Sequence, residues 1–357
     1  MKIDKIEIYR LQIPLKRPYK IATAEMKFFD STIVVINSEG RQGIGEAMAG
    51  VEGYFWEKPE EVWQFAKENA PALLNVSIAE GKTRIDAFVE KHPCAATPFL
   101  TAMEMVSGNP LLLPPSETQL VPMVGILQAT DRAGIEKEIR DFLAQGYGTI
   151  KIKVGFDVDD DLQRVKTAQE IIAGKALIRA DANQGYDLSS ARKFVDTVDP
   201  AGIEFLEQPL PENAWQDMAE LARSSPLPLG LDESIYGIEA VEKARQLNCA
   251  KFVKFKLMKM GSAERLARGI EAARNYGMEV ILGNGAAGEI TCYHEALVAH
   301  KLVTRAGEMN GFLKVRESIL GDAIKTRAGK VVLDPNFPLK LGPQKINLYA
   351  LDRKVFK

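Results

Sequence analysis

Five charged residues recur at nearly constant intervals through the second half of the sequence. Each ends a short apolar run that is typical of a β-strand, and subtraction of residue numbers gives separations of 28, 26, 25 and 24. The series consists of Lys153, Asp181, Glu207, Asp232 and Lys256. One strand–helix unit has about this length, so the five side chains should lie at one height in consecutive units. A single charge at a strand end is usually solvated, but five at a common spacing favour an active site.

The three acidic members of the series indicate a metal site. Adjacent carboxylates repel one another and raise each other's pKa, and a bound hard divalent cation would relieve this repulsion. Asp181, Glu207 and Asp232 offer only oxygen ligands, which suit Mg²⁺ better than zinc, with Mn²⁺ as an alternative. No histidine or cysteine lies in the series, and we interpret His92, His294 and His300 as structural or surface residues.

The two lysines of the series suggest proton transfer. If the strands close into an eight-stranded barrel, Lys153 and Lys256 end the second and sixth strands and face each other across its mouth. A lysine that lies near a cation and is partly desolvated has a lowered pKa and can act as a base. Two opposed bases can remove a proton from one face of a carbon and return it to the other. A metal ion would stabilise the enediolate that forms when a carboxylate substrate loses its α-proton.

The N-terminal third of the chain predicts a separate α+β domain. Residues 1–48 read as antiparallel strands with a hairpin turn at residues 38–40, and residues 58–107 read as helical. Residues 109–118 hold three prolines and predict a connector. We therefore predict a capping domain over residues 1–118, with the C-terminal segment 322–357 packing back on it.

From Val121 onward, strand and helix patterns alternate, which predicts parallel strands with helical crossovers. Eight strand candidates occur, and the eighth, in the segment RAGEMNG, is short and polar. This number matches a closed barrel in residues 119–321. The competing fold is an open doubly wound sheet, but no GxGxxG follows the first strand, which weakens its dinucleotide-binding form.

Taken together, the strand-end motifs resemble those of the enolase superfamily, in the muconate lactonizing enzyme subgroup. That subgroup includes dipeptide epimerases, N-acylamino acid racemases and cycloisomerases. The matching segments are Lys151-Ile152-Lys153, Asp181-Ala182-Asn183, Glu207-Gln208-Pro209, Asp232-Glu233-Ser234 and Lys256–Lys259. The resemblance implies a modified TIM barrel, (β/α)₇β, with an N-terminal α+β capping domain. It also implies that Lys153 and Lys256 are general bases, that Lys151 is an auxiliary cation, and that the three carboxylates bind Mg²⁺.

The sequence departs from the subgroup at the eighth strand, where many dipeptide epimerases carry a D-x-D pair that holds the substrate's amino group. Here Glu308 and Asn310 stand in Gly307-Glu308-Met309-Asn310-Gly311, so they contact the substrate or merely close a turn. Asn284 stands between Gly283 and Gly285. This segment either lets the backbone approach the ligand or forms only a turn after the strand. Candidate lid residues either contact the substrate or pack the seam between the domains, and they are Tyr19, Thr23, Tyr54 and Trp56.

Composition excludes several classes of partner. The net charge of −2 gives no electrostatic case for binding nucleic acid or an anionic membrane. Three cysteines without CxxC spacing suggest reduced thiols in the cytoplasm. No apolar run approaches the length of a membrane span. We expect a small carboxylate substrate as partner and, from the resemblance alone, a homo-oligomer.

The predicted function is that of an isomerase. We expect an Mg²⁺-dependent racemase or epimerase that abstracts the α-proton of a carboxylate substrate, an amino-acid derivative, between two lysines. Alternatives on the same site are a lyase that eliminates a β-leaving group, of the dehydratase or o-succinylbenzoate synthase type, and a muconate-type cycloisomerase. A metal-free enzyme that forms a Schiff base through a lysine, or a relative that only binds ligand, represents another class.

Overall fold

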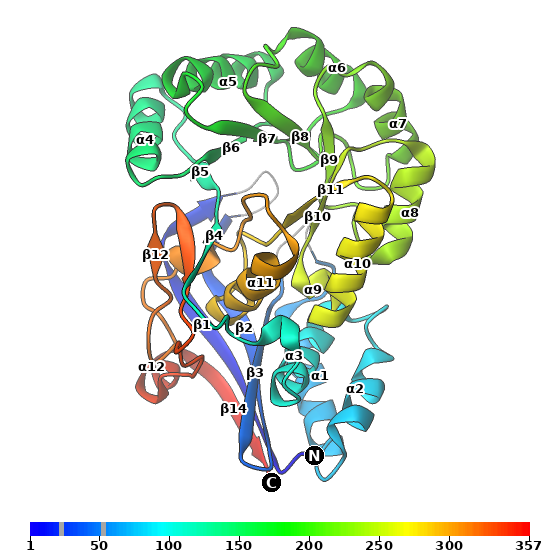
Figure 1. Ribbon diagram of the computed structural model, residues 1–357, viewed down its shortest axis with the longest axis vertical. Helices are drawn as coiled ribbons and strands as arrows, with labels where there is room; N and C mark the ends of the chain where they lie inside the picture. Colours follow the sequence, from blue (N-terminus) through cyan, green and yellow to red (C-terminus); the bar gives the residue numbers. More distant parts are fainter. Residues whose placement is uncertain (21–24, 51–54) are drawn as a thin grey trace.

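The computed structural model describes residues 1–20, 25–50 and 55–357 (Figure 1). An antiparallel sheet with the strand order β14-β1-β2-β3 forms the lower part of the molecule in this view. Its strands are β1 (Lys5–Lys20), β2 (Glu25–Ser38), β3 (Arg41–Met48) and β14 (Ala350–Phe356). The turn between β2 and β3 places Glu39 and Gly40 at positive φ, the backbone form that a tight hairpin needs.

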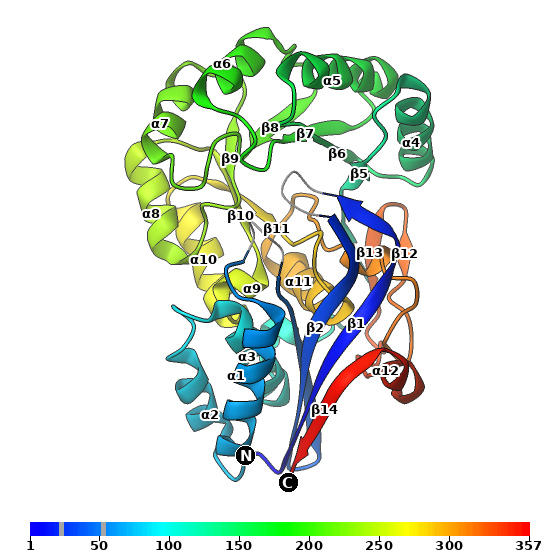
Figure 2. The same ribbon diagram turned by 180° about the vertical axis from the view of Figure 1, so that it is seen from behind.

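Three helices lie on one side of this sheet (Figure 2). They are α1 (Pro59–Ala72), α2 (Ile78–Asp86) and α3 (Pro93–Val106), so the predicted helical region 58–107 consists of three separate helices. Two glycines of β3 allow α3 to pack closely. A Cβ atom on Gly43 would lie 2.0 Å from the Ala102 carbonyl oxygen, and one on Gly45 would lie 2.1 Å from that of Pro98. Larger residues at these two positions would push the helix off the sheet.

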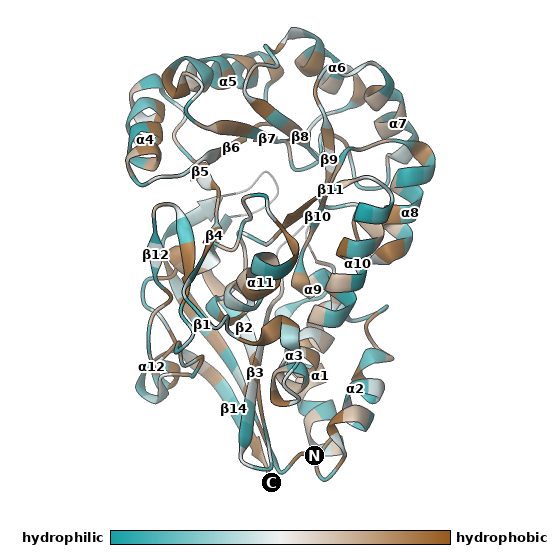
Figure 3. Cartoon of the chain, viewed as in Figure 1, coloured by the Kyte–Doolittle hydropathy of each residue, from teal (hydrophilic) through white to brown (hydrophobic). Residues whose placement is uncertain are grey.

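Seven parallel strands form a curled sheet with the order β11-β10-β9-β8-β7-β6-β5. Helices α4 to α8 make the outer arc around strands β5 to β9 (Figure 1). The strands are β5 (Gly125–Leu127), β6 (Thr149–Lys153), β7 (Leu177–Asp181), β8 (Ile203–Glu207), β9 (Leu229–Leu231), β10 (Phe252–Phe255) and β11 (Glu279–Leu282). The helices are α4 (Arg132–Ala144), α5 (Val158–Ile172), α6 (Leu188–Thr197), α7 (Trp215–Ser224), α8 (Gly237–Leu247), α9 (Leu257–Met260), α10 (Ala263–Asn275) and α11 (Glu289–Leu302). The outer helices mix polar and apolar residues (Figure 3).

The eighth strand candidate is a bridge rather than a strand, because few of its residues pair. Gly307 accepts a hydrogen bond from Val124 N at 2.9 Å and donates one to Pro122 O at 2.9 Å, while Glu308 N donates to Leu282 O at 3.0 Å. Segment 307–308 thus links the β11 edge to the chain before β5. The parallel sheet is closed as a barrel, which is the predicted (β/α)₇β architecture and excludes the open doubly wound alternative.

The remaining elements join the two halves of the molecule. They are β4 (Gln119–Pro122), β12 (Thr326–Arg327), β13 (Lys330–Leu333), α12 (Pro343–Tyr349) and the short 3₁₀ helices η1 (Pro110–Leu112) and η2 (Gly311–Leu313). Strand β13 pairs antiparallel with β4, and β14 pairs antiparallel with β1. Within the described ranges, no helix combines the length and apolar character that crossing a bilayer requires.

Two buried carboxylates of the N-terminal half cap helices of the barrel half. Glu46 of β3 accepts hydrogen bonds from the backbone of Ile290 and Thr291 at the start of α11, at 2.9 and 3.1 Å. Glu104 of α3 does the same for Ala263 and Glu264 of α10, at 2.9 and 3.0 Å. Burial raises the pKa of Glu46 to about 7 and that of Glu104 to about 6. These caps satisfy backbone donors that would otherwise be orphaned at the domain seam.

His294 of α11 is expected to make the fold sensitive to acid. Its side chain is buried, and burial lowers its pKa from 6.5 to about 4. Between these two values the unfolded chain binds a proton that the folded chain does not, so stability is lost as the pH falls through this window. Because one pKa unit corresponds to about 1.4 kcal/mol, the full loss is about 3 kcal/mol.

The His294→Gln variant should lack this pH dependence. The raised pKa values of Glu46 and Glu104 act in the opposite direction, because a carboxyl that protonates more readily in the folded state adds stability as the pH falls. The quantity to measure is therefore the difference between wild-type and variant unfolding free energies from urea titrations at several pH values between 4.5 and 7.5. Parallel curves for the two proteins would contradict the prediction.

Candidate active site

Strands β6 and β10 each direct two lysines into the barrel. Side chains alternate across a strand, so Lys151 and Lys153 share one face of β6, while Lys254 and Lys256 share one face of the β10 segment. Three strands, β7 to β9, lie between these two strands in the sheet order. Sequence reasoning missed Lys254. The signal was present, because the sequence KFK at 254–256 repeats the spacing of KIK at 151–153.

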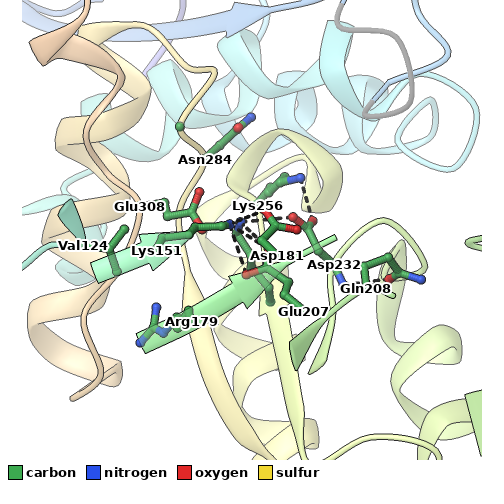
Figure 4. Close-up of polar contacts among 12 residues, drawn as sticks. Val124, Lys151, Arg179, Asp181, Glu207, Gln208, Asp232, Lys256, Asn284 and Glu308 are labelled. Carbon is green, nitrogen blue, oxygen red and sulfur yellow. Dashed lines mark hydrogen bonds and ion pairs between the residues drawn. The ribbon is translucent and has the colours of Figure 1, made fainter. Parts of the chain in front are cut away.

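The two deeper lysines, Lys151 and Lys254, bridge the carboxylates, and Figure 4 shows Lys151 among them. Lys151 Nζ lies 2.7 Å from Asp181 Oδ2 and 3.0 Å from Glu207 Oε1, and it also contacts Glu308. Lys254 Nζ lies 2.9 Å from Glu207 Oε1, 3.0 Å from Asp232 Oδ2 and 2.7 Å from Glu308 Oε1. The strand-end carboxylates are therefore held together through two buried ammonium groups.

The two outer lysines each pair with a different aspartate. Lys153 Nζ lies 2.6 Å from Asp181 Oδ2 and also donates to Asn183 Oδ1. Lys256 Nζ lies 2.6 Å from Asp232 Oδ1. The Lys153 side chain is 14% exposed and that of Lys256 only 1%. The outer lysines thus sit on opposite sides of the carboxylate group, and the Lys153 side is the more open to solvent.

Register explains why residues so far apart in sequence meet here. Lys153 pairs with Asp181, which in turn pairs with Glu207, across β6, β7 and β8. Glu207 is level with Gly230, so Asp232 lies two residues farther along, just beyond the end of β9. The series predicted from spacing alone therefore follows the mouth of the barrel, with its last members just past the strand ends.

Among the described residues, this cluster contains four carboxylates and five lysines, because the Nζ of buried Lys259 also lies 3.8 Å from Asp232 Oδ1. Burial opposes the charged form of Lys153, but the Asp181 carboxylate outweighs it, so the Lys153 pKa lies above its ordinary value. The pKa values of Lys151 and Lys254 are raised against burial by the same kind of neighbours. Burial and the neighbouring Asp181 raise the pKa of Glu207.

The carboxylates suit a hard divalent cation in donor type. Asp181, Glu207 and Asp232 are each fully buried, supply only oxygen, and come from three successive strands. Among the residues that the structure describes, no three carboxylate, histidine or cysteine side chains already form a metal-binding group, because the ammonium groups of Lys151 and Lys254 lie between the carboxylates. A cation would enter by displacing these ammonium groups.

Of the two substrate contacts predicted from the eighth strand, Glu308 lies in this cluster, whereas Asn310 contacts Val124 and Lys314. Glu308 is buried and bridges Lys151 and Lys254, so its carboxylate belongs to the ion network. Asn310 Nδ2 donates to Val124 O at 3.2 Å, and its Oδ1 accepts from Lys314 Nζ at 3.0 Å. Asn284, another predicted substrate contact, follows β11. It closes a turn there, because its Oδ1 accepts a hydrogen bond from Ala286 N at 2.9 Å. It lies apart from the ion network (Figure 4).

The predicted lid residues are separated in the structure. Tyr19 is buried at the end of β1, with its ring 4.6 Å from Lys314 Nζ. Trp56 is 53% exposed and packs on Tyr236 at a ring separation of 4.6 Å, so it lies on the surface and not against the lysines. Thr23 and Tyr54 fall outside the described residues.

Comparisons with known proteins fit this geometry. The family model described as "Enolase C-terminal domain-like" matches residues 134–336, more than half of the chain. The N-succinyl-L-Arg/Lys racemase of Bacillus cereus is 26% identical over 335 residues, which covers 89% of this chain and 90% of that protein. The cis-3-hydroxy-L-proline dehydratase of Roseibium aggregatum is 27% identical, covering 73% of this chain and 74% of that protein.

Solved structures share the whole fold. The muconate lactonizing enzyme of Pseudomonas putida superposes with a TM-score of 0.86 at 23% identity, covering 98% of this chain and all of that one. A dipeptide epimerase of Enterococcus faecalis, solved with Mg and the dipeptide L-Leu-L-Tyr, gives a TM-score of 0.85 at 21% identity, covering 96% of this chain and 99% of that one. At these identities the likeness establishes the fold.

Proposed function

The chain belongs to the enolase C-terminal domain-like family, and from this premise we propose that it is a racemase or epimerase acting on the α-carbon of an amino-acid derivative. The family match confirms the resemblance to the enolase superfamily, muconate lactonizing enzyme subgroup, predicted from the strand-end motifs. The observation that carries the proposal is the placement of Lys153 and Lys256 on opposite sides of three buried carboxylates.

The two outer lysines are the proposed proton carriers. A substrate α-carbon held between Lys153 and Lys256 would lose its proton to one amine and regain a proton from the other on the opposite face. Asp181 and Asp232 orient these amines through contacts of 2.6 Å. Each outer lysine has an aspartate of its own, although Asp181 also contacts Lys151 and Asp232 also contacts Lys254.

The proposed metal ligands are Asp181, Glu207 and Asp232, with Mg²⁺ the expected ion and Mn²⁺ the alternative. A divalent ion held there would supply positive charge to the substrate carboxylate as the α-proton leaves, and would favour the neutral form of nearby lysines. Lys151 and Lys254 hold the same three carboxylates from below. Until a cation displaces them, these two ammonium groups keep the carboxylate oxygens together at the barrel mouth.

A second candidate reaction uses the same first step. Loss of the α-proton followed by departure of a β-substituent would make the protein a dehydratase, and a dehydratase stands among its relatives. A cycloisomerase also starts from the same charged centre. We favour racemisation because one amine on each side of the α-carbon is what proton return to the opposite face requires, whereas elimination needs a base on one side only. A small carboxylate remains the expected partner in each case, and a homo-oligomer remains a prediction.

Exchange of the α-hydrogen in D₂O tests the proposal. With MgCl₂ present, we expect deuterium at the α-carbon of at least one N-acylated amino acid or dipeptide, accompanied by inversion, when a broad panel is followed by ¹H NMR and chiral chromatography. Elimination would instead give an unsaturated product. Absence of exchange from every member of the panel would overturn the proposal, and trapping of a substrate adduct with borohydride would favour a Schiff-base lysine.

A further inference from the structure

A carboxyl group lies in the middle of α11, a helix that is enclosed along most of its length. The residues of α11 from Glu289 to Ala299 are all buried, and Glu295 among them is 0% exposed. Burial raises the pKa of Glu295 to about 8, which reflects the cost of placing an acid there. A buried polar group is tolerated where hydrogen bonds replace its lost contacts with water, so the partners of Glu295 indicate what the acid does.

The carboxyl group of Glu295 accepts one hydrogen bond from each of two strand ends. Its Oε1 accepts from the backbone N–H of Leu257 at 2.9 Å, and its Oε2 accepts from that of Asn284 at 3.2 Å. Leu257 follows β10 and Asn284 follows β11, and these two strands are neighbours in the parallel sheet. Glu295 therefore ties together the points at which the chain leaves two adjacent strands.

Pairing between the two strands has already ended where Glu295 binds. The last pair of the β10–β11 ladder is Phe255 with Leu282, so Leu257 and Asn284 lie beyond it. Leu257 is the first residue of α9, and its N–H has no acceptor within that helix. Gly283 turns the other segment at a φ of +117°, a backbone form that favours glycine. The carboxyl group from α11 thus supplies acceptors that neither the sheet nor α9 provides.

The bond to Leu257 holds the peptide group that joins Lys256 to α9. Lys256 contributes the carbonyl oxygen of this group, which accepts from Lys259 N at 3.0 Å, so the group is held at both of its polar atoms. The peptide orientation sets the direction in which the Lys256 side chain leaves the backbone, and its amine lies 2.6 Å from Asp232 Oδ1 (Figure 4). Movement of this peptide group would move the amine with it.

The opposite proton carrier is held by other elements. The backbone oxygen of Lys153 accepts from Arg164 Nη1 of α5 at 2.8 Å, and its amine contacts Asp181 and Asn183 at the end of β7. None of these contacts involves α11. A disturbance at Glu295 should therefore reach Lys256 directly and leave the contacts of Lys153 in place.

We propose that Glu295 is a positioning residue for Lys256, which fixes the peptide group after this lysine and so aims its amine at one face of the substrate α-carbon. The inference rests on the proposed function, since it takes Lys256 as a proton carrier. It goes beyond that function by assigning a role to a residue of α11 that lies outside every strand-end motif.

The Glu295→Gln variant tests the proposal through the stereochemistry of exchange. Glutamine keeps the size of the side chain, but its amide nitrogen cannot accept from a backbone N–H, so at least one of the two hydrogen bonds is lost. For the substrate enantiomer whose α-proton exchange depends on Lys256, kcat should fall at least about tenfold, and for the other enantiomer by less than about threefold. Glu295→Asp, which keeps an acid on a shorter side chain, should show the same imbalance to a smaller degree.

Amide hydrogen exchange followed by mass spectrometry tests the linkage without turnover. In Glu295→Gln, the peptides that contain Leu257 and Asn284 should exchange about tenfold faster than in the wild-type protein, and the peptide that contains Lys153 should be unchanged. Glu46→Gln is the matched control, because Glu46 also accepts two backbone hydrogen bonds, at the start of α11. It should leave the ratio between the two enantiomers as in the wild-type protein.

The outcomes separate this inference from the function on which it rests. Equal losses for both enantiomers in Glu295→Gln would overturn the positioning role, as would unchanged amide exchange at Leu257. An imbalance of the same size in Glu46→Gln would also overturn it, because the effect would then be a general response of α11. If the proposed function itself is wrong, the wild-type protein exchanges the α-proton of neither enantiomer, whereas failure of the inference requires a wild-type protein that exchanges both.

Discussion

Replacing Lys153 with alanine is expected to block α-proton exchange from one enantiomer of the substrate and to leave exchange from the other. Lys256→Ala should show the opposite selectivity. The reason is geometric, because each amine lies on its own side of the carboxylate group and reaches only one face of the α-carbon. Loss of a positioned general base lowers a rate by about 10²–10⁴-fold, so racemisation should fall by at least this factor in both variants.

Arginine variants separate proton transfer from charge. Lys153→Arg and Lys256→Arg keep a cation beside Asp181 or Asp232, but a guanidinium does not give up its proton near neutral pH. They should therefore resemble the alanine variants in exchange rate while retaining more substrate affinity. Exchange measured by ¹H NMR on each pure enantiomer decides the matter, and equal losses for both enantiomers in a single-lysine variant would contradict a two-base mechanism.

A large loss of Mg²⁺ affinity is expected when a proposed metal ligand is replaced. Glu207 is the position at which this loss can be measured without disturbing an outer lysine. Asp181 and Asp232 each hold an outer lysine, whereas the ion-pair partners of Glu207 are the deeper Lys151 and Lys254. Glu207→Gln preserves the shape of the side chain and removes one charged ligand, so we expect Mg²⁺ affinity to fall at least about tenfold. The exchange rate at low MgCl₂ should fall by about 10²-fold. Calorimetric titration with MgCl₂ measures the binding directly.

A variant that should raise Mg²⁺ affinity, and not lower it, provides the matched control. Lys254→Met removes a cation that lies 2.9 and 3.0 Å from two of the proposed ligands, so it lowers the repulsion that an incoming divalent ion meets. Mg²⁺ should bind this variant about tenfold more tightly than it binds the wild-type protein. Dialysis against EDTA should abolish exchange by the wild-type protein, and MgCl₂ should restore it. Undiminished exchange after chelation, together with unchanged binding in both variants, would remove Mg²⁺ from the proposed site.

Much of the barrel and its charged mouth could be predicted because parallel strands carry a regular signal. Apolar runs that end in a charge at intervals of 24 to 28 residues are enough to identify Lys153, Asp181 and Lys256. The eighth strand lacked that signal because it consists of a bridge at Gly307, whose pairing uses backbone groups and imposes no side-chain pattern. Residues 58–107 read as helical, and apolar spacing does not show where turns such as the one at Asn75 divide this range into separate helices.

Sequence reasoning missed two lysines, Lys254 and Lys314, for different reasons. Lys254 was detectable in principle, because it stands two residues before Lys256 on the same face of the strand. Lys314 was not, because it lies just after the short 3₁₀ helix η2 in a segment without periodicity, and only the folded chain brings it to Gly285 and Tyr19. Residues recruited from irregular segments become recognisable only through the contacts they make.

The carboxylate caps at the seam bear on how this scaffold can be recombined. Glu46 and Glu104 belong to the N-terminal half, but the backbone groups they satisfy belong to α10 and α11 of the other half. A chimaera that replaces residues 1–118 of this chain with those of a relative would leave these backbone amides without acceptors unless the donor supplies acids at matching places. Domain exchanges intended to alter specificity should therefore include Glu46 and Glu104 together with α10 and α11, the helices that they cap.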